Sequence, residues 1–383
     1  MPISKATKFT LLFLSMMTVM SNIAIVTSIP HLKEYFSDVA EMELYSRLMI
    51  TLPSLSIALL APFLGHFLHR FKKRDSVMFG LFFFSLLGSA GLYLETIEGL
   101  LLSRALFGVS VAILMIISTA LVGDYFRGKE RNKYMGLQSA FSAIGAITFL
   151  LGGGFLSDID WRYPFGIYLM GMVVFPFVLL FLKEPESEVQ EEGEEGSCTS
   201  LLGIYFLAFI IMLLFFTLPT QMPFLMINVF GVSGTLTGMI IATSFVTNTI
   251  GAVGFARLKE HLSFGQIYLL GMALISIGFY GIGLVKEVHY FFLTSAILGF
   301  GGGILMANNM VWMLSKADVS QRIKSSGYIT SALFFGQFLS PIVFHPLVSF
   351  LGVQQFFEWM GIVIFVVVLL VVFIRQIMQK RVR

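Results

Sequence analysis

The sequence has few charged residues and a single cysteine. Charged residues make up 12% of the 383 and hydrophobic residues 57%, whereas soluble domains have roughly 25% and 45–50%. This excess of apolar residues excludes an ordinary soluble core and predicts a protein whose partner is the lipid bilayer. Because Cys198 is the single cysteine, an intramolecular disulfide is excluded, and cysteine usage gives no information on the compartment.

Sequence motifs of enzymes and of nucleotide-binding proteins are also missing. There is no G-x-x-x-x-G-K-[ST] phosphate loop, no H-E-x-x-H and no G-x-S-x-G. The glycine run at residues 299–303 lies inside an apolar stretch, where close helix packing or a bend explains it better than a nucleotide loop. We therefore expect no enzyme, no cofactor, no metal site and no nucleic-acid partner.

The sequence contains instead a series of apolar runs long enough to cross a membrane. A membrane helix needs about 20 apolar residues, and a β-barrel would show alternating segments of about 10 residues. The runs therefore predict an all-α membrane protein with twelve transmembrane helices. They cover approximately residues 8–36, 44–68, 76–95, 99–122, 134–157, 163–182, 201–229, 234–256, 265–285, 289–315, 326–350 and 354–375.

An acidic segment at residues 183–200 separates the first six runs from the last six. It contains seven glutamates and almost nothing apolar, so burial cannot offset its ordering entropy and a solvated linker is predicted. We expect an N-terminal six-helix bundle at residues 1–182 and a C-terminal six-helix bundle at residues 201–383, ending in a basic tail. The first run is longer than a signal-peptide core and is predicted to be a retained helix.

The distribution of lysine and arginine predicts the orientation. Both termini and the linker are predicted to be cytoplasmic, because this arrangement places all but five of the 25 basic residues on the cytoplasmic side. The five exceptions are Lys33, Arg47, Arg104, Arg162 and Lys286. The two halves also share a layout, with a basic loop after the second run and a mixed-charge loop after the fourth. Such internal repeats are typical of secondary transporters, whose site lies between the repeats.

The loop at residues 65–74 (GHFLHRFKKR) resembles a loop between the second and third helices of the major facilitator superfamily. Gly65, Arg70 and Arg74 match the family pattern, whereas His69 stands where the family has an aspartate. The resemblance implies that this loop braces the two halves on the cytoplasmic side. His69 would make that brace weaker or differently built. Without the resemblance, the basic residues are equally explained by the orientation rule.

Further stretches resemble motifs of the twelve-helix drug/proton antiporter branch of that superfamily. They comprise Arg104 and Gly108 in the fourth run, Asp124, Arg131 and Gly136 in the loop that follows, Gly145, Gly153 and Gly154 in the fifth run, and Gly336, Gln337 and Pro341 in the eleventh. The Gly-Pro pair of the fifth-helix motif falls on Phe149 and Leu150 here, so the expected kink is not encoded. The resemblance implies two pseudo-symmetric six-helix bundles and gating roles for the matched loop and glycine positions.

Arg104 is the most informative single residue. A charge inside a membrane helix costs about 2.5–3.5 kcal/mol on insertion scales, and such residues usually face a cavity or a partner. The resemblance implies a role for Arg104 in proton coupling or in substrate binding. The alternative is that the side chain extends to the nearby membrane surface.

The predicted runs have no aspartate or glutamate near their middle, although a proton antiporter usually needs a group that titrates. Glu34, just after the break at residues 28–30, is the first candidate for proton coupling, and a solvated loop carboxylate is the alternative. His345 in the eleventh run is a second titratable candidate, with helix-end packing as its alternative.

Neutral polar and aromatic residues are the candidates for substrate contact. In the resembled family the helices that carry Asn22, Phe141, Phe149 and Gln337 line the central cavity, which implies substrate binding for these side chains together with Arg104. Many rings and few charges suit an amphiphilic substrate, although interhelical hydrogen bonds and lipid-facing packing explain the same residues.

The sequence therefore predicts a monomeric secondary transporter of the inner membrane. It would export a small amphiphilic molecule by alternating access in exchange for protons. A sugar, a metal-chelating metabolite or another metabolite as substrate, and transport without protons, remain alternatives. A membrane receptor that transports nothing is a remote one.

Overall fold

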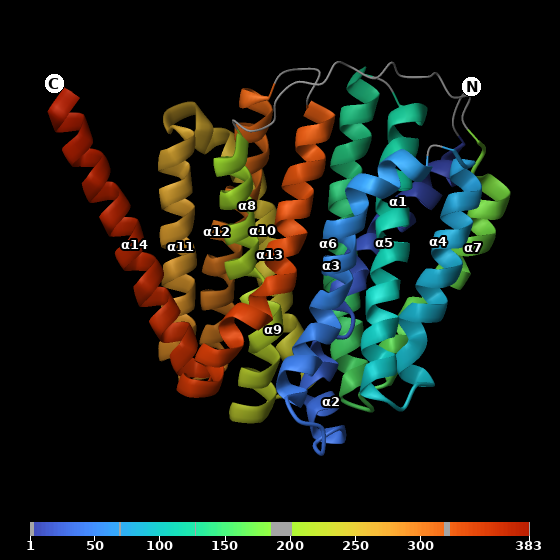
Figure 1. The fold of residues 1–383 in the computed structure, drawn as a ribbon, viewed down its shortest axis with the longest axis horizontal. Helices are drawn as coiled ribbons and strands as arrows, with labels where there is room; N and C mark the ends of the chain where they lie inside the picture. Colours follow the sequence, from blue (N-terminus) through green and yellow to red (C-terminus); the bar gives the residue numbers. More distant parts are fainter. Residues whose placement is uncertain (1–3, 69, 127, 185–200, 318–321, 383) are drawn as a thin grey trace.

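The computed structural model describes residues 4–68, 70–126, 128–184, 201–317 and 322–382. Within these residues every regular element is a helix (Figure 1). The elements are α1 (Lys5–Ile23), η1 (Val26–Ser28), α2 (Ile29–Tyr35), α3 (Met42–Leu68), α4 (Lys73–Gly88), η2 (Ser89–Leu92), α5 (Ile97–Tyr125), α6 (Gly128–Ser157), η3 (Tyr163–Leu169), α7 (Met170–Phe181), α8 (Leu202–Phe215), α9 (Thr217–Pro223), η5 (Phe224–Val229), α10 (Gly234–His261), α11 (Phe264–Leu284), α12 (Tyr290–Lys316), α13 (Arg322–Leu351) and α14 (Val353–Val382).

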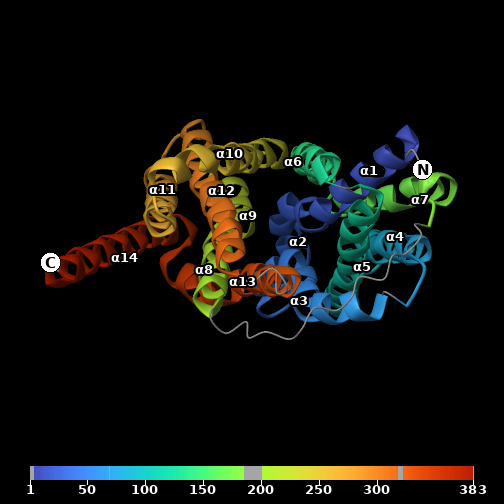
Figure 2. The same cartoon turned by 90° about the horizontal axis from the view of Figure 1, so that it is seen from above.

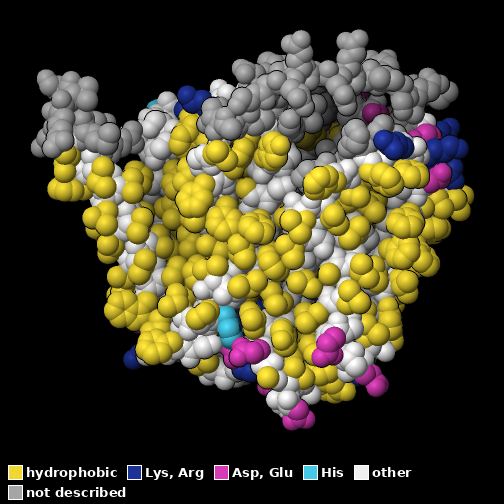
Figure 3. Space-filling view, viewed as in Figure 1, with side chains coloured by type: hydrophobic (Ala, Val, Ile, Leu, Met, Phe, Trp, Pro, Cys, Tyr) yellow, Lys and Arg dark blue, Asp and Glu magenta, His cyan; other side chains and the backbone are white. Residues whose placement is uncertain are grey.

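Twelve helical segments of the described part are long and apolar enough to cross a membrane, which confirms the predicted all-α fold. Most predicted runs differ from these segments by a few residues at either end. The helix that contains the fifth run is longer than the run, since α6 begins at Gly128 and the run was predicted to begin at residue 134. On the face shown in Figure 3, hydrophobic side chains cover the middle of the molecule and charged side chains gather near its two ends. This distribution matches the apolar centre and polar surfaces of a bilayer.

Both chain termini lie at the same end of the helices (Figure 1). Glu184 lies just after α7 and Leu201 lies just before α8. The two ends of the linker segment therefore lie at that end of the molecule too. We call it the linker end and the opposite end the far end. Because α8 starts at the linker end, α10 starts at the far end. Residues 185–200 of the linker fall outside the described residues, as does His69 of the predicted brace.

The first and the seventh membrane segments are both interrupted. In the first, α1 gives way to the 3₁₀ turn η1 before α2, whose first turn contains Pro30. In the seventh, α8 is followed by the short α9 with Pro223 at its end and by the π-helical η5. Proline lacks a backbone N–H and cannot continue the hydrogen-bond ladder of a helix. The two interruptions occupy corresponding positions in the two halves, as the resemblance to a repeated architecture implies.

The helices pack as two groups, one on each side of the molecule (Figure 2). In the N-terminal group, α5 packs on α3 and α4, and in the C-terminal group α12 packs on α10 and α11. Across the boundary between them, α3 packs on α13 and α6 on α10, while η1 contacts both α9 and α10. The interrupted helices therefore lie at the boundary between the halves.

Candidate functional site

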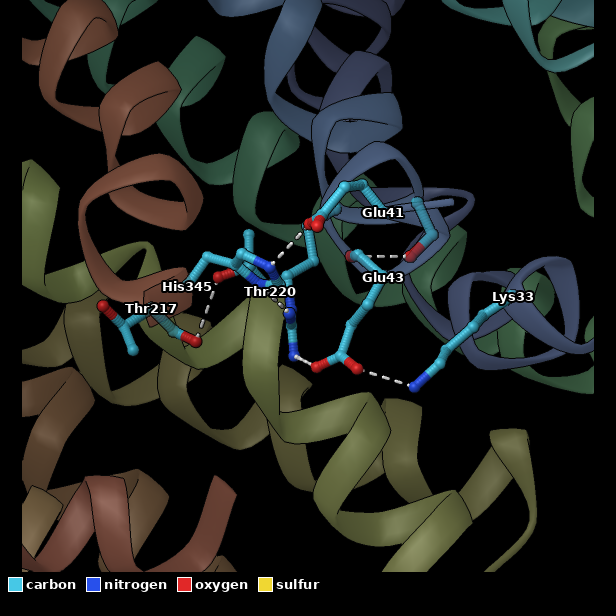
Figure 4. Close-up of polar contacts among 8 residues, drawn as sticks. Lys33, Glu41, Glu43, Thr217, Thr220 and His345 are labelled. Carbon is cyan, nitrogen blue, oxygen red and sulfur yellow. Dashed lines mark hydrogen bonds and ion pairs between the residues drawn. The ribbon is translucent and has the colours of Figure 1, made fainter. Parts of the chain in front are cut away.

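An ionic cluster joins the halves at the far end. Glu43 of α3 binds Lys33 through a 2.6 Å contact and Arg47 through a 2.7 Å contact. Nη1 of Arg47 donates to Nδ1 of His345 on α13 over 3.1 Å. Arg47 is completely buried, and its guanidinium lies 4.4 Å from the ring centroid of Phe224 in η5. The buried charge thus has partners on both halves. Figure 4 shows Lys33, Glu43 and His345 converging.

A second polar contact joins α6 to α10. The carboxylate of Asp158, directly after α6, accepts from the backbone N–H groups of Gly234 and Thr235 and from the hydroxyl of Thr235 at 2.6 Å. The first N–H groups of a helix have no partner within the helix and carry the positive end of its dipole. Asp158 of one half therefore stabilises the start of a helix of the other half.

We expect Asp158→Asn to weaken closure of the far end by about 1 kcal/mol, a shift toward opening of roughly five-fold. An amide carries no charge and accepts through one atom, so it leaves part of the α10 terminus unpartnered. The shift is measured as the distance between spin labels at Glu95→Cys and Lys286→Cys, in a Cys198→Ser background. Both labelled residues are exposed at the far end, on opposite halves.

Asp160→Asn is the matched control for this substitution. Asp160 is exposed, and its Oδ1 accepts from the backbone N–H of Arg162 at 2.8 Å, within one loop. The control should leave the label distances as in the wild type. Unchanged distances in Asp158→Asn would contradict a role for Asp158 in holding the halves together.

Both interrupted helices carry buried polar side chains without hydrogen-bond partners. On the first segment these are the Oδ1 of Asn22 and the hydroxyls of Thr27 and Ser28, and on α9 both amide atoms of Gln221. Gln221 is completely buried, and η1, which ends at Ser28, packs on α9. Buried polar groups are normally satisfied, so a group of unsatisfied ones marks a place where a ligand or water supplies partners. Discontinuous helices at a repeat boundary are the usual binding place in transporters.

The sequence analysis missed Gln221, Thr27, Ser28 and Asp158. The prolines of the seventh run could have indicated the site. Like Pro30 in the first run, they predict an interrupted helix, and the two interruptions fall at corresponding positions of the two halves. No sequence signal identified Asp158, since its partner is a helix terminus rather than a charged residue.

The predicted substrate-binding residues lie on several helices of both halves. Asn22 is buried and its Nδ2 lies 3.4 Å from Oγ of Ser54 on α3. Gln337 is buried on α13, which packs on α3. On α6, Phe149 is buried and Phe141 is half-buried. Asn22 thus belongs to the unpartnered group, and substrate contact by all of these residues stays a prediction.

Arg104 lies inside the N-terminal half. It is completely buried, and its Nη2 donates to the backbone carbonyl of Gly88 at the end of α4. The guanidinium lies 4.9 Å from the ring centroids of Phe107, Phe165 and Tyr168. Its Nε and Nη1 have no hydrogen-bond partner. The charge is held by rings rather than by a carboxylate, and the side chain does not extend to the membrane surface.

Glu34, the predicted proton-coupling carboxylate, is largely exposed on α2. Its Oε2 lies 3.8 Å from Nδ1 of His31 on the same helix. Glu34 also lines a cavity of about 550 Å³ at the far end, together with Lys33, Glu41, Glu43, His345 and other residues. It makes no described contact with the other half, so its coupling role stays a prediction.

The predicted gating loop makes its described contacts within the N-terminal half. Lys73 binds Asp124 at 2.5 Å, and Nη2 of Arg74 donates to the carbonyl of Leu179. The backbone N–H groups of Lys73 and Arg74 donate to Glu184, which caps α4 at the start of the linker. Arg74 and Asp124 thus belong to one polar surface of the linker end, and Arg70 is exposed in the loop before α4. The brace between the halves stays a prediction. The side chain of Arg131 and the surroundings of Gly65 and Gly136 fall outside the described residues.

The predicted glycines of α6 lie at close helix contacts. A Cβ at Gly145 would lie 3.1 Å from Cβ of Met16 on α1. A Cβ at Gly153 would lie 2.1 Å from the carbonyl oxygen of Ala24, just before η1. At Gly154 it would lie 2.6 Å from the carbonyl oxygen of Gly234 on α10. The last contact crosses the boundary between the halves, as a gating role requires.

Comparisons with known proteins agree with this architecture. The chain matches the Major Facilitator Superfamily over residues 11–205 and 204–381. It is 26% identical over 315 residues to "Multidrug resistance protein 1" of Bacillus subtilis, covering 77% of this chain and 78% of that protein. It is 27% identical over 224 residues to "Tetracycline resistance protein, class B" of Escherichia coli, covering 58% and 53%. A bacterial homologue of the human lysosomal transporter Spinster, solved in an inward-facing and occupied conformation, superposes with a TM-score of 0.78 at 15% identity, covering 96% of both chains. The chain belongs to the Major Facilitator Superfamily and is a multi-pass membrane transporter rather than an enzyme.

Proposed function

We propose that the chain exports a small amphiphilic organic molecule by alternating access, in exchange for protons. The observation that carries this proposal is the meeting of two interrupted helices, one from each half, with unpartnered buried polar groups on both. Such a place offers hydrogen bonds to a ligand at the boundary that must open and close during transport. The contacts of Arg47 and Asp158 support a far end that is closed in this conformation.

The chemistry of the surroundings favours an amphiphilic substrate. The unpartnered groups of Asn22, Thr27, Ser28 and Gln221 are all neutral, so they suit a few directional hydrogen bonds rather than a strongly charged ligand. Phe149, on the adjoining α6, adds aromatic surface. Export of drug-like compounds agrees with the names of the relatives, which are multidrug and tetracycline resistance proteins.

The membrane setting follows from the charge distribution. We place both termini and the linker end in the cytoplasm and the far end outside the inner membrane, because basic loops are retained on the cytoplasmic side. The substrate then enters from the linker end and leaves after the far end opens. Opening requires separation of α3 from α13 and of α6 from α10.

Flux measurements in proteoliposomes test the proposal. We expect that one substrate class from a panel of amphiphilic cations, neutral sugars and metal chelators dissipates an imposed pH gradient. Dissipation by amphiphiles supports the proposal, whereas a response to sugars or chelators alone would assign the substrate to those classes. Substrate movement without proton movement would contradict exchange.

Gln221→Leu tests the binding place in the same assay. We expect the KM of the responding substrate to rise by about ten-fold, because the loss of one or two hydrogen bonds costs roughly 1–2 kcal/mol. Stability should be maintained, since both amide atoms are unpartnered and a leucine removes two unsatisfied buried groups. Thr249→Ala is the control, because the exposed Thr249 donates to the carbonyl of Phe245 in its own helix. An unchanged KM in Gln221→Leu would contradict this site.

A further inference from the structure

His345 joins the two halves through a bond that depends on its protonation. Nδ1 of His345 lies 3.1 Å from Nη1 of Arg47, and Nε2 lies 3.4 Å from Oε2 of Glu41. A guanidinium can only donate hydrogen bonds, so Nδ1 must accept and carry no proton. The proton of the neutral imidazole then sits on Nε2 and points toward Glu41. The contact in this conformation therefore requires a neutral His345.

A second proton would have to occupy Nδ1 and face the guanidinium. Two donors at that distance repel each other, and Arg47 cannot move into water because it is completely buried and bound to Glu43. The imidazolium keeps its attraction to Glu41, but that carboxylate is 65% exposed, so water screens the interaction. Glu41 also lies on the turn before α3 rather than in the helix. Protonation thus removes the hydrogen bond between Arg47 of α3 and His345 of α13, and the screened attraction between His345 and Glu41 is too weak to replace it.

The other charged groups around the cavity do not change this outcome. From α2, Lys33 is bound to Glu43, and Glu34 lies beside His31. From η5 and α13 the cavity lining adds the neutral Asn228 and Ser349. From α14, Glu358 packs against Gly283 of α11. The side chain of His345 is 16% exposed and lines this cavity of about 550 Å³, through which water can deliver a proton.

We propose that the Arg47–His345 bond is a pH-sensitive contact that holds the far end closed while His345 is neutral and releases it when His345 is protonated. Imidazole is the side chain that titrates nearest to neutral pH. Acid on the outer side therefore favours opening, and with it substrate release. The inference rests on the proposed alternating access, but not on proton exchange. A proton that binds here from the outer side also leaves there, so His345 regulates opening and does not itself carry protons across.

The test measures the distance between spin labels at Glu95→Cys and Lys286→Cys as the pH falls from 8 to 5.5, without substrate, in the Cys198→Ser protein. We expect the open-to-closed ratio to rise by about ten-fold in the otherwise unchanged chain, since protonation removes one hydrogen bond to a charged group. In His345→Asn the ratio should change less than two-fold, because the amide oxygen accepts from Arg47 at every pH.

Two further variants keep the inference falsifiable should His345→Asn fold poorly. Glu41→Gln removes a carboxylate that attracts the imidazolium in the closed state, so it should raise the open-to-closed ratio reached at pH 5.5 above that of the unchanged chain. His31→Asn, which removes an imidazole whose described ionic partner is on its own helix, should respond as the unchanged chain does. A response of His345→Asn or of Glu41→Gln equal to that of the unchanged chain would overturn the inference.

Failure of this inference and failure of the proposed function give different results. If proton-coupled flux occurs and His345→Asn keeps the pH-dependent opening, the function stands and the inference is wrong. If opening depends on His345 while no substrate moves protons, the inference stands and proton exchange is wrong. If the label distances never change under any condition, alternating access is contradicted and the inference fails with it.

Discussion

Gly154→Ala is expected to shift the protein from the closed to the open far end without unfolding it. The added Cβ would lie 2.6 Å from the carbonyl oxygen of Gly234 and 3.0 Å from Cα of Thr235. Both neighbours are backbone atoms and cannot rotate away. Overpacking of this kind costs about 1–3 kcal/mol. Because α6 and α10 belong to different halves, the cost falls on the closed arrangement and disappears when the helices separate.

The measurement is the same far-end label distance, and the expected change in the open-to-closed ratio is roughly 30-fold for a cost of about 2 kcal/mol. Gly152→Ala is the matched control, because a Cβ there meets nothing within 4 Å. It should leave the ratio unchanged. Gly303→Ala gives the contrasting case, since its Cβ would lie 1.8 Å from the carbonyl oxygen of Asn248 within one half. That variant should melt at lower temperature instead of opening. A Gly154→Ala protein that stays closed, or that melts like Gly303→Ala, would contradict the gating role.

The membrane helices could be predicted from the sequence because each depends on local composition. A run of about 20 apolar residues is sufficient to place a helix in a bilayer, and the break near Pro30 is equally local. The extension of α6 back to Gly128 was not predicted, because the polar residues 128–133 continue the helix beyond the apolar run. Helix ends that lie beyond the hydrocarbon are set by capping and packing rather than by hydropathy.

The contacts that form the candidate site could not be predicted, because they join residues far apart in the chain. Nothing local to Asp158 indicates that its carboxylate caps a helix that starts 76 positions later. Gly154 was identified by its resemblance to a motif, but its partner Gly234 follows only from the packing of α6 on α10. His345 was noted as titratable. Its pairing with Arg47, 298 positions away, follows only from the packing of α3 on α13.

Arg104→Met is expected to leave the protein as stable as the unchanged chain or more so, and to reduce proton-coupled transport by about 100-fold. Even buried ion pairs can often be replaced by apolar side chains of similar size with no loss, or with a gain of about 1–4 kcal/mol, and the buried charge of Arg104 has no ionic partner among the described residues that would be left behind. Methionine also packs well against the rings of Phe107, Phe165 and Tyr168. Thermal melting in detergent reports the first effect, and flux in proteoliposomes the second.

Transport should be lost because the buried guanidinium of Arg104 has few hydrogen-bond partners and no described ionic one. Its guanidinium donates to the carbonyl of Gly88 and faces three rings, while Nε and Nη1 stay unpartnered in the interior. Ionisable residues kept inside a membrane protein at such cost are functional in most cases. Arg104→Lys is the control that keeps the charge but loses the planar face that stacks on the rings. It should retain more transport than the methionine variant and melt at a lower temperature. Full transport in Arg104→Met would show that Arg104 is structural, whereas a large drop in its melting temperature would show that the ring contacts outweigh the cost of the buried charge.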